Sequence, residues 1–118
     1  MNKTTIQELV DLIARFRDER DWKQFHDPKN MAIALSIETN ELLEHFLWRN
    51  RDESERRVIE KRDQISQEIA DISIYLFELV DNLGIDLADA IKRKLSANAQ
   101  KYPVEKARGR SEKYSELP

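Results

Sequence analysis

Cysteine is absent from this 118-residue sequence, glycine occurs only twice and proline three times, and no long hydrophobic run is present. The lack of cysteine excludes disulfides and thiolate metal sites, and it allows a reducing compartment. So few glycines and prolines favour long helices over many short strands. No stretch approaches the roughly 20 apolar residues that span a bilayer, and the N-terminus has no apolar signal region. We therefore expect a cytoplasmic protein that does not bind membranes.

A positive net charge is also lacking, because acidic residues outnumber basic ones and the formal charge is −3. This charge and the absence of a helix-turn-helix pattern argue against a nucleic-acid-binding protein. Basic residues nevertheless concentrate in one part of the chain, between Lys92 and Lys113. A local cluster of this kind favours contact with a phosphate-rich small molecule.

What the sequence does contain is apolar periodicity with helix caps. Thr5, Asp27 and Asp86 precede helical patterns as N-caps, Gly84 follows one as a stop, and Pro103 disfavours helical geometry before it. These signals predict four helices, over residues 6–21, 28–48, 54–82 and 86–101.

The length suits a single domain over residues 1–118. Helices alone predict an all-α fold, a four-helix bundle followed by a loosely structured basic tail over residues 103–118. From Ile69 to Val80 the third helix is apolar nearly all round. A helix that is apolar on every side is buried on every side, so one face would pack within the subunit and another on a second subunit. We therefore predict a homodimer or a larger assembly.

Two pairs of carboxylates form the most informative pattern: Glu38 with Glu41 in the second helix, and Glu68 with Asp71 in the third. Residues three apart are neighbours on a helix surface. At about 100° per residue, both pairs fall within the apolar stripe of their helix rather than opposite it. A single Glu-x-x-Glu is usually a solvated helix face, and that alternative stays open. Two such pairs inside apolar stripes indicate acidic groups that face the core.

Four buried carboxylates without cations would cost several kcal/mol each, so they require protonation, basic partners or a hard metal ion. Lys94 could neutralise only one of them. A divalent cation neutralises several charges at once, and carboxylate-only ligation suits Mg²⁺, with Mn²⁺ as a substitute, rather than zinc. A di-iron bundle would need Glu-x-x-His pairs, whereas Glu41 and Glu68 are followed three residues later by Glu44 and Asp71.

Two further groups of residues indicate an anion and a planar ligand. On the fourth helix Lys94, Asn98 and Lys101 share one face, on which a lysine and an amide four residues apart can reach one anion. A lysine that snorkels at a helix end is the alternative. Planar side chains beside a metal–anion site favour a stacked base, although each one alone also fits ordinary hydrophobic packing. The planar side chains are Trp22, Phe25, His26, Trp48 and Tyr75.

Five motifs in order cover nearly the whole chain. They are Arg20-Asp21-Trp22-x-x-Phe25-His26-x-Pro28-x-Asn30, Glu38-x-x-Glu41-Leu42-x-Glu44, Glu68-x-x-Asp71-x-x-x-Tyr75-Leu76, Asn98-x-x-x-Tyr102-Pro103 and Lys113-Tyr114-x-Glu116-Leu117. Together they resemble the MazG-like group of all-α nucleoside triphosphate pyrophosphohydrolases, near its dCTP-pyrophosphatase branch. The carboxylate motifs alone are moderately specific, whereas all five motifs in order are highly specific.

The resemblance implies a four-helix subunit that forms dimers or dimers of dimers, and an enzyme that cleaves nucleoside triphosphates to monophosphate and pyrophosphate. The metal ligands that it implies for Mg²⁺ are Glu38, Glu41, Glu68 and Asp71. The residues that it places around base and sugar are Trp22, His26, Trp48 and Tyr75. Those that it places near the triphosphate are Lys94, Asn98, Lys101 and Tyr102.

The predicted reaction is attack of water at the α-phosphate, with Glu38 or Glu41 as the general base. The resemblance implies dCTP-like nucleotides as substrates, in sanitation or control of the nucleotide pool. The alternative is a non-catalytic helical module that dimerises through the third helix and binds a partner by its basic tail. That alternative predicts no response to metal and no turnover of nucleotides.

Overall fold

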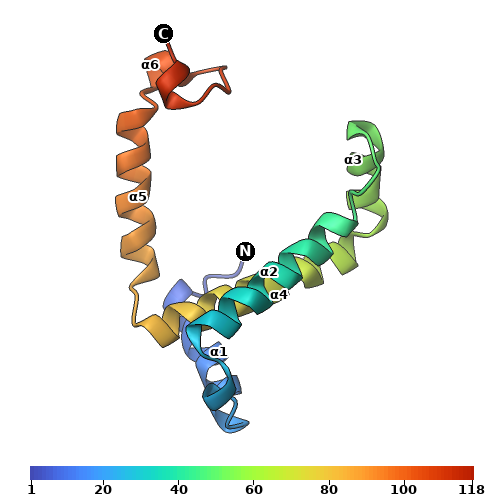
Figure 1. The fold of residues 1–118 in the computed structure, drawn as a ribbon, viewed down its shortest axis with the longest axis vertical. Helices are drawn as coiled ribbons and strands as arrows, with labels where there is room; N and C mark the ends of the chain where they lie inside the picture. Colours follow the sequence, from blue (N-terminus) through green and yellow to red (C-terminus); the bar gives the residue numbers. More distant parts are fainter. The chain divides into compact units, whose positions relative to one another are not determined.

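The structure, a computed structural model, describes all residues from Met1 to Pro118, and its regular elements are all helical (Figure 1). The predicted all-α class is confirmed. The chain divides into two compact units, Met1–Gly84 and Ile85–Pro118, and each is described here by itself. That both units belong to one domain stays a prediction. None of the helices has the length and the apolar character needed to cross a bilayer.

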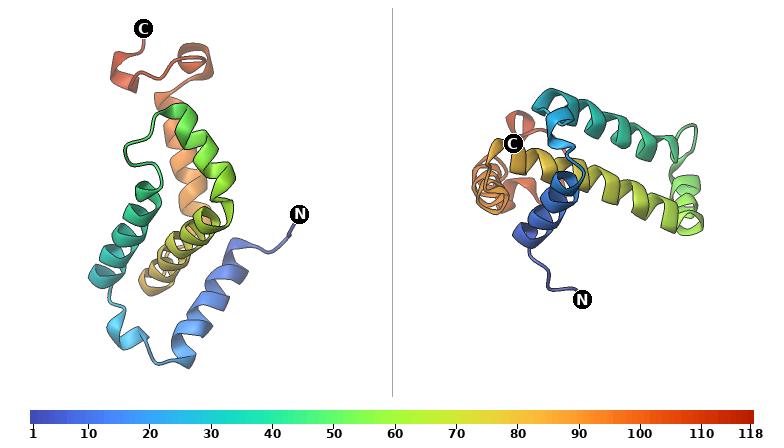
Figure 2. Two further views of the ribbon diagram at one scale, coloured as in Figure 1. Left: turned by 90° about the vertical axis from the view of Figure 1, so that its right-hand side faces the viewer. Right: turned by 90° about the horizontal axis from the view of Figure 1, so that it is seen from below.

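The first unit contains four α-helices and one short 3-10 helix. They are α1 (Ile6–Glu19), η1 (Lys23–Phe25), α2 (Pro28–Glu44), α3 (Arg51–Glu60) and α4 (Arg62–Leu83). α4 lies alongside α2 and runs in the opposite direction, and it also packs against α1 (Figure 2). α3 contacts α4 near the end where α2 stops and α4 begins (Figure 1). This arrangement sets the carboxylate motif of α2 against that of α4.

Polar caps lie at three helix starts where the sequence predicts them. The side chains of Thr5, Asp27 and Asp86 each accept a hydrogen bond from the backbone N–H three residues further on, at 3.1, 2.8 and 3.0 Å. Gly84 follows the last turn of α4 with φ +64°. This left-handed conformation is available to glycine without a steric penalty, and it ends the helix.

The predicted helix over residues 54–82 is wrong in two respects. It is two helices, α3 and α4, and the first begins at Arg51, where Asn50 caps it, rather than at residue 54. Lys61, with φ −115° and ψ 30°, separates them. Val58 and Ile59 are the only apolar residues of α3, so a straight extension of α4 through this segment would bury little apolar surface. No glycine or proline marks the break, which is why the pattern of residues does not reveal it.

The first two helices also end earlier than predicted. α2 ends at Glu44 rather than at residue 48, and it is followed by turns through Trp48, which has φ +62°. α1 ends at Glu19 rather than at residue 21. Asp21 has φ +54° and so leaves helical geometry.

The second unit contains α5 (Leu87–Lys101), α6 (Val104–Ala107) and η2 (Tyr114–Glu116). The tail over residues 103–118 is therefore more ordered than predicted. The ring of Tyr114 lies 6.0 Å from the ring of Tyr102 and 4.9 Å from Nζ of Lys101. These aromatic and cation–π contacts hold the tail against the last turn of α5.

Few apolar side chains are fully buried in this chain: Val10, Met31, Ile65 and Val80, all less than 8% exposed. Many other large apolar side chains of the first unit remain exposed, and they include Leu9, Leu12, Phe16, Ile33, Ile37, Leu43, Ile69 and Ile74. Apolar surface of this extent is typical of a protein–protein contact. The predicted homodimer or tetramer is compatible with it and stays a prediction.

Candidate active site

The antiparallel pairing of α2 and α4 brings the two predicted carboxylate pairs near one another. Burial raises the pKa of Glu38 above its ordinary value, and the adjacent Glu41 carboxyl group raises it further, as do the charges of Asp71 and Glu68. Neighbouring negative charges disfavour the ionised form of a carboxyl group, and they do so only over short distances. The four predicted carboxylates therefore form one electrostatic cluster.

The chemistry of this cluster fits a hard divalent cation. Oε2 of Glu38 is buried and has no hydrogen-bond partner, whereas buried polar atoms normally have one. Carboxylate oxygens are the ligands that Mg²⁺ and Mn²⁺ prefer. No three acidic or histidine side chains stand in an arrangement that could hold a metal ion. The metal ligands stay a prediction.

A histidine and an arginine stand behind one member of the cluster. Nε2 of His45 lies 2.6 Å from Oε2 of Glu68, and Nε of Arg57 donates a hydrogen bond to Nδ1 of His45 at 3.2 Å. Because Nδ1 accepts, the proton of a neutral ring is on Nε2, which faces Glu68. The approach to Oε2 is close but poorly aligned, so this buried oxygen has an ion-pair contact without a well-directed hydrogen bond.

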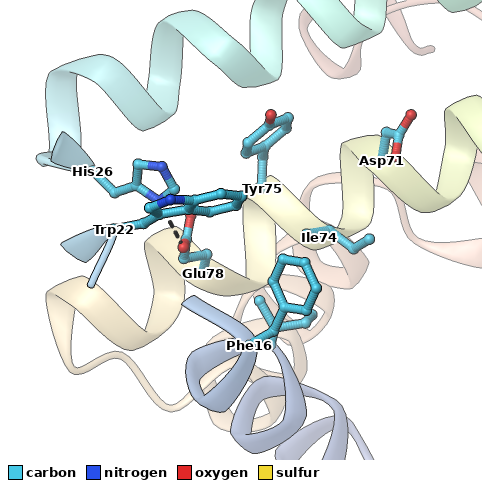
Figure 3. A pocket seen from close by; sticks show the side chains of 8 residues that line it. Phe16, Trp22, His26, Asp71, Ile74, Tyr75 and Glu78 are labelled. Carbon is cyan, nitrogen blue, oxygen red and sulfur yellow. Dashed lines mark hydrogen bonds and ion pairs between the residues drawn. The ribbon is translucent and has the colours of Figure 1, made fainter. Parts of the chain in front are cut away.

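A cavity of about 270 Å³ opens beside the cluster (Figure 3). Its walls come from α1, α4 and the segment between α1 and α2. The lining residues are Ile13, Phe16, Trp22, His26, Asp71, Ile74, Tyr75 and Glu78. In Figure 3, Trp22, His26 and Glu78 gather at one end, Asp71 lies at the other, and Tyr75 stands between them. The cavity therefore joins an aromatic end to the acidic cluster.

Tyr75 links the two ends electrostatically as well. Burial raises the pKa of its phenol above the ordinary value, and the charges of Glu38 and Asp71 raise it further, followed by that of Glu78. A phenol with a raised pKa keeps its proton at neutral pH and remains a hydrogen-bond donor. Tyr75 can therefore donate to a ligand that extends from the aromatic end toward the carboxylates.

A network of partly buried polar groups fixes the aromatic end. Nδ1 of His26 donates to Oε1 of Glu78 at 2.8 Å, and the amide of Asn82 donates to the His26 carbonyl at 2.8 Å. Asn82 in turn accepts from Nη1 of Arg17 at 2.7 Å. Arg17 is only 2% exposed and also pairs with Asp81 at 2.9 Å. These bonds attach the segment that carries His26 to the last turns of α1 and α4.

Comparison with known proteins identifies the family. Residues 33–117 match the model of the MazG-like family. The chain belongs to this family. The predicted resemblance is thus confirmed.

The MazG-like chain is similar to dCTP pyrophosphatase 1 from two mammals. It is 37% identical to the Bos taurus protein over an alignment of 119 positions that covers 99% of this chain and 70% of that protein. It is 38% identical to the Homo sapiens protein over 116 residues, 97% of this chain and 68% of that protein. A crystal structure of a pyrophosphatase from Archaeoglobus fulgidus is 41% identical, with a TM-score of 0.80 over 87% of this chain and 96% of that one.

Five substrate-binding residues predicted for this MazG-like chain stay predictions. Trp48 does not line the cavity, and its side chain is 92% exposed. The remaining four lie in the second unit, on α5 or at its C-cap: Lys94, Asn98, Lys101 and Tyr102. Their contact with a triphosphate, like that of Trp48 with a base, stays a prediction.

Four site residues did not emerge from the sequence pattern: Arg57, Phe16, Glu78 and Asn82. The partners of Glu78 and Asn82 are 52 and 56 positions away in the chain, so no local periodicity reports on them. Glu78 does carry a signal in retrospect, since it is a charged residue inside the apolar part of α4 between Phe77 and Leu79. A charged residue in such a position is rarely buried without a partner.

Proposed function

We propose that this protein hydrolyses deoxynucleoside triphosphates, dCTP-like ones first, to monophosphate and pyrophosphate with the help of Mg²⁺, in sanitation or control of the nucleotide pool. The enzyme class predicted from the sequence is confirmed by the relatives: the protein is a nucleoside triphosphate pyrophosphohydrolase. The metal, the preferred base and the cellular role belong to the proposal. A non-catalytic interaction module does not agree with this enzyme class.

The observation that supports the metal is the state of Glu38. A partly buried carboxyl group with three acidic neighbours and one unpartnered oxygen is unfavourable by itself, and a divalent cation would neutralise the cluster. The proposed ligands are Glu38, Glu41, Glu68 and Asp71. When bound there, Mg²⁺ would supply charge neutralisation at the phosphates and acidify a bound water.

The chain's own residues are proposed to supply a general base, to orient the nucleotide and to form the apolar wall of its cavity. Glu38 or Glu41 is proposed to accept the proton of the attacking water, because a carboxylate near the reacting phosphate can act as general base. Asp71 at one end of the cavity and Trp22 at the other would direct the phosphates and the base in opposite directions. The nucleoside part would occupy the cavity, whose 270 Å³ lies near the lower end of the roughly 300–1,000 Å³ of ligand pockets.

The cationic face of α5 is proposed to contact the triphosphate. Lys94, Asn98 and Lys101 follow one another at helical spacing on that face. Cations and amides that hold the leaving pyrophosphate would stabilise the negative charge that develops on it.

The test is analysis of the products from a panel of nucleoside triphosphates with Mg²⁺. Monophosphate plus pyrophosphate, with dCTP among the best substrates, is the expected result. Diphosphate plus phosphate would contradict the proposed bond cleavage, and a uniform lack of turnover would contradict the function altogether.

A pair of variants then tests the carboxylates. Glu41→Gln should lower kcat by roughly 100-fold or more, as loss of a general base or a metal ligand does. Glu60→Gln, which changes an exposed carboxylate on α3, is the matched control and should keep full activity. Circular dichroism checks that both variants keep their helical content. Wild-type activity in Glu41→Gln would remove this residue from the site.

A further inference from the structure

Glu78 is a buried carboxyl group in the wall of the cavity, at the end opposite Asp71 (Figure 3). The residue is 3% exposed. Burial of a carboxylate costs free energy unless hydrogen bonds or charges compensate for it. A glutamate is therefore energetically unfavourable next to the apolar and aromatic side chains of Phe16, Trp22 and Ile74 in this wall.

His26, the one hydrogen-bond partner of Glu78, does not occupy all the acceptor positions of the Glu78 carboxyl group. Nδ1–H of His26 donates to Oε1 at 2.8 Å, and no other side chain or backbone group of the protein forms a hydrogen bond or ion pair with this carboxyl group. A carboxylate has two oxygens and about four acceptor positions. Two side-chain oxygens are buried without a hydrogen-bond partner, and they belong to Glu38 and Glu68 rather than to Glu78. The free acceptor positions of Glu78 are therefore open to the cavity that it lines.

The position of this acceptor is fixed rather than adjustable. His26 holds the Glu78 carboxyl group, Asn82 holds the His26 carbonyl at 2.8 Å, and Arg17 holds Asn82 at 2.7 Å. Trp22 lies against His26 with ring centroids 5.9 Å apart. A planar ligand that enters beside Trp22 therefore meets a preorganised acceptor at its edge, and preorganised polar groups discriminate well between ligands.

We propose that Glu78 is a specificity-determining residue, which accepts a hydrogen bond from the exocyclic amino group of the nucleobase and disfavours bases with a carbonyl there. The inference rests on the proposed function, because it needs a nucleotide in the cavity with its phosphates toward Asp71. Cytosine, adenine and guanine carry such an amino group, and a glutamate accepts well from N4 of cytosine. Uracil and thymine have the O4 carbonyl at that edge. This carbonyl and the Glu78 carboxylate are both acceptors, so no hydrogen bond would form between them.

The sharpest test compares dCTP with dUTP. Cytosine has an amino group at position 4, whereas uracil has a carbonyl there and a proton on N3. Wild-type protein should have the higher kcat/KM for dCTP. In Glu78→Gln the side chain keeps its shape and an oxygen for His26, but it also offers an amide donor. The dCTP/dUTP ratio of kcat/KM should therefore fall by roughly 10- to 100-fold, the range of one base-edge contact.

A matched control separates selectivity from general damage. Ile74→Val alters the same cavity wall without changing a donor or an acceptor, so it should change the kcat/KM of both nucleotides alike and keep their ratio. A ratio that is unchanged in Glu78→Gln, or lowered equally in Ile74→Val, would overturn the assignment of Glu78.

Wild-type protein alone provides a second measurement that does not depend on the folding of a variant. The triphosphate of the pyrimidin-2-one deoxynucleoside has hydrogen in place of the amino group, and its kcat/KM should fall roughly 10- to 100-fold below that of dCTP. Equal rates on dCTP, dUTP and this analogue, with pyrophosphate released from all three, would refute the role of Glu78 and leave the proposed function intact. Absence of pyrophosphate from every triphosphate would instead refute the proposed function.

Discussion

Among single residues, Glu38 combines burial with three acidic neighbours, and all of them raise the pKa of its carboxyl group. The spacing of the four carboxylates in the two motifs was sufficient to predict that they lie near one another, because helical periodicity determines which side chains share a face. It did not predict their burial correctly, since Glu41 and Asp71 are exposed. The same periodicity could not predict that Arg57 and Glu78 join the site. Their contacts cross between helices, and only the packed fold determines which helices meet.

The raised pKa of Glu38 makes a prediction about stability and pH. In the absence of divalent cations, the folded state keeps the Glu38 proton to a higher pH than the unfolded chain, in which the ordinary value is 4.5. Between these two values the folded state binds more protons, so the contribution of Glu38 to stability falls as the pH rises. Glu38→Gln should therefore be more stable than metal-free wild type at neutral pH, and this difference should vanish as the pH falls through 4.5.

Urea unfolding in EDTA at a series of pH values measures this difference, with Glu60→Gln as the control. Addition of Mg²⁺ and a non-hydrolysable triphosphate should then stabilise the wild type but not Glu38→Gln, because ligands that bind only the folded state raise its stability. A difference between the two proteins that does not change with pH would contradict the electrostatic cluster.

Trp48 gives a second prediction at this scale. Its φ of +62° places a bulky residue in the left-handed region, which costs about 1–2 kcal/mol for residues other than glycine. Strained backbone of this kind often accompanies function. We expect Trp48→Gly to be more stable than Trp48→Ala by about 1 kcal/mol, since both lose the ring but only glycine relieves the strain.

The same two variants test the predicted role of Trp48 at the base. Both should raise KM for the nucleotide, whereas Trp48→Phe, which keeps an aromatic ring, should retain a KM near that of the wild type. Urea unfolding and steady-state kinetics measure the two effects separately. An unchanged KM in both ring-free variants would remove Trp48 from the substrate site.

At the scale of helices and turns, local chemistry determined what could be predicted. The side chains of Thr5, Asp27 and Asp86 accept from backbone N–H groups only three residues away, so these three helix starts followed from the sequence. The break at Lys61 did not, because no turn residue marks it. The break arises because α3 has little apolar surface to bury, and burial depends on the assembled unit rather than on the segment alone.

The capping box of α3 yields the prediction at this scale. Asn50 accepts from the backbone N–H of Glu53 at 2.9 Å, and the Glu53 side chain accepts from that of Asn50 at 3.4 Å. Asn50→Ala should lower the stability of α3 by about 1 kcal/mol, while Asn50→Asp should preserve it. Amide hydrogen exchange resolves the effect, since protection should fall in α3 before it falls in α2 or α4. Equal loss throughout the unit would indicate that α3 does not open on its own.

At the scale of the whole molecule, the small set of buried apolar residues contrasts with the extent of exposed apolar surface on α1, α2 and α4. The four buried apolar side chains are few for a chain of this length, and small chains often gain stability by association. The prediction that the third helix, now α4, packs both within the subunit and on a second subunit is therefore a prediction about assembly, and a single chain does not test it.

We expect the protein in solution to have two or four times the 14.0 kDa of one chain. Light scattering after size-exclusion chromatography measures this mass. Ile69, which is 50% exposed on α4, offers a site for disruption: Ile69→Lys should shift the mass toward one chain and make the melting temperature depend more steeply on concentration. Gln64→Lys, on the same helix outside its apolar part, is the control. A wild-type mass of one chain would contradict the predicted assembly.

The interruption at Lys61 has a consequence for how the active site is tuned. Because the helix stops there, α3 is free to set its own direction, and its Arg57 meets His45 behind Glu68. A change in the length or helicity of the connection between α2 and α4 would therefore alter the contacts from Arg57 through His45 to Glu68, although α3 itself carries none of the four candidate carboxylates.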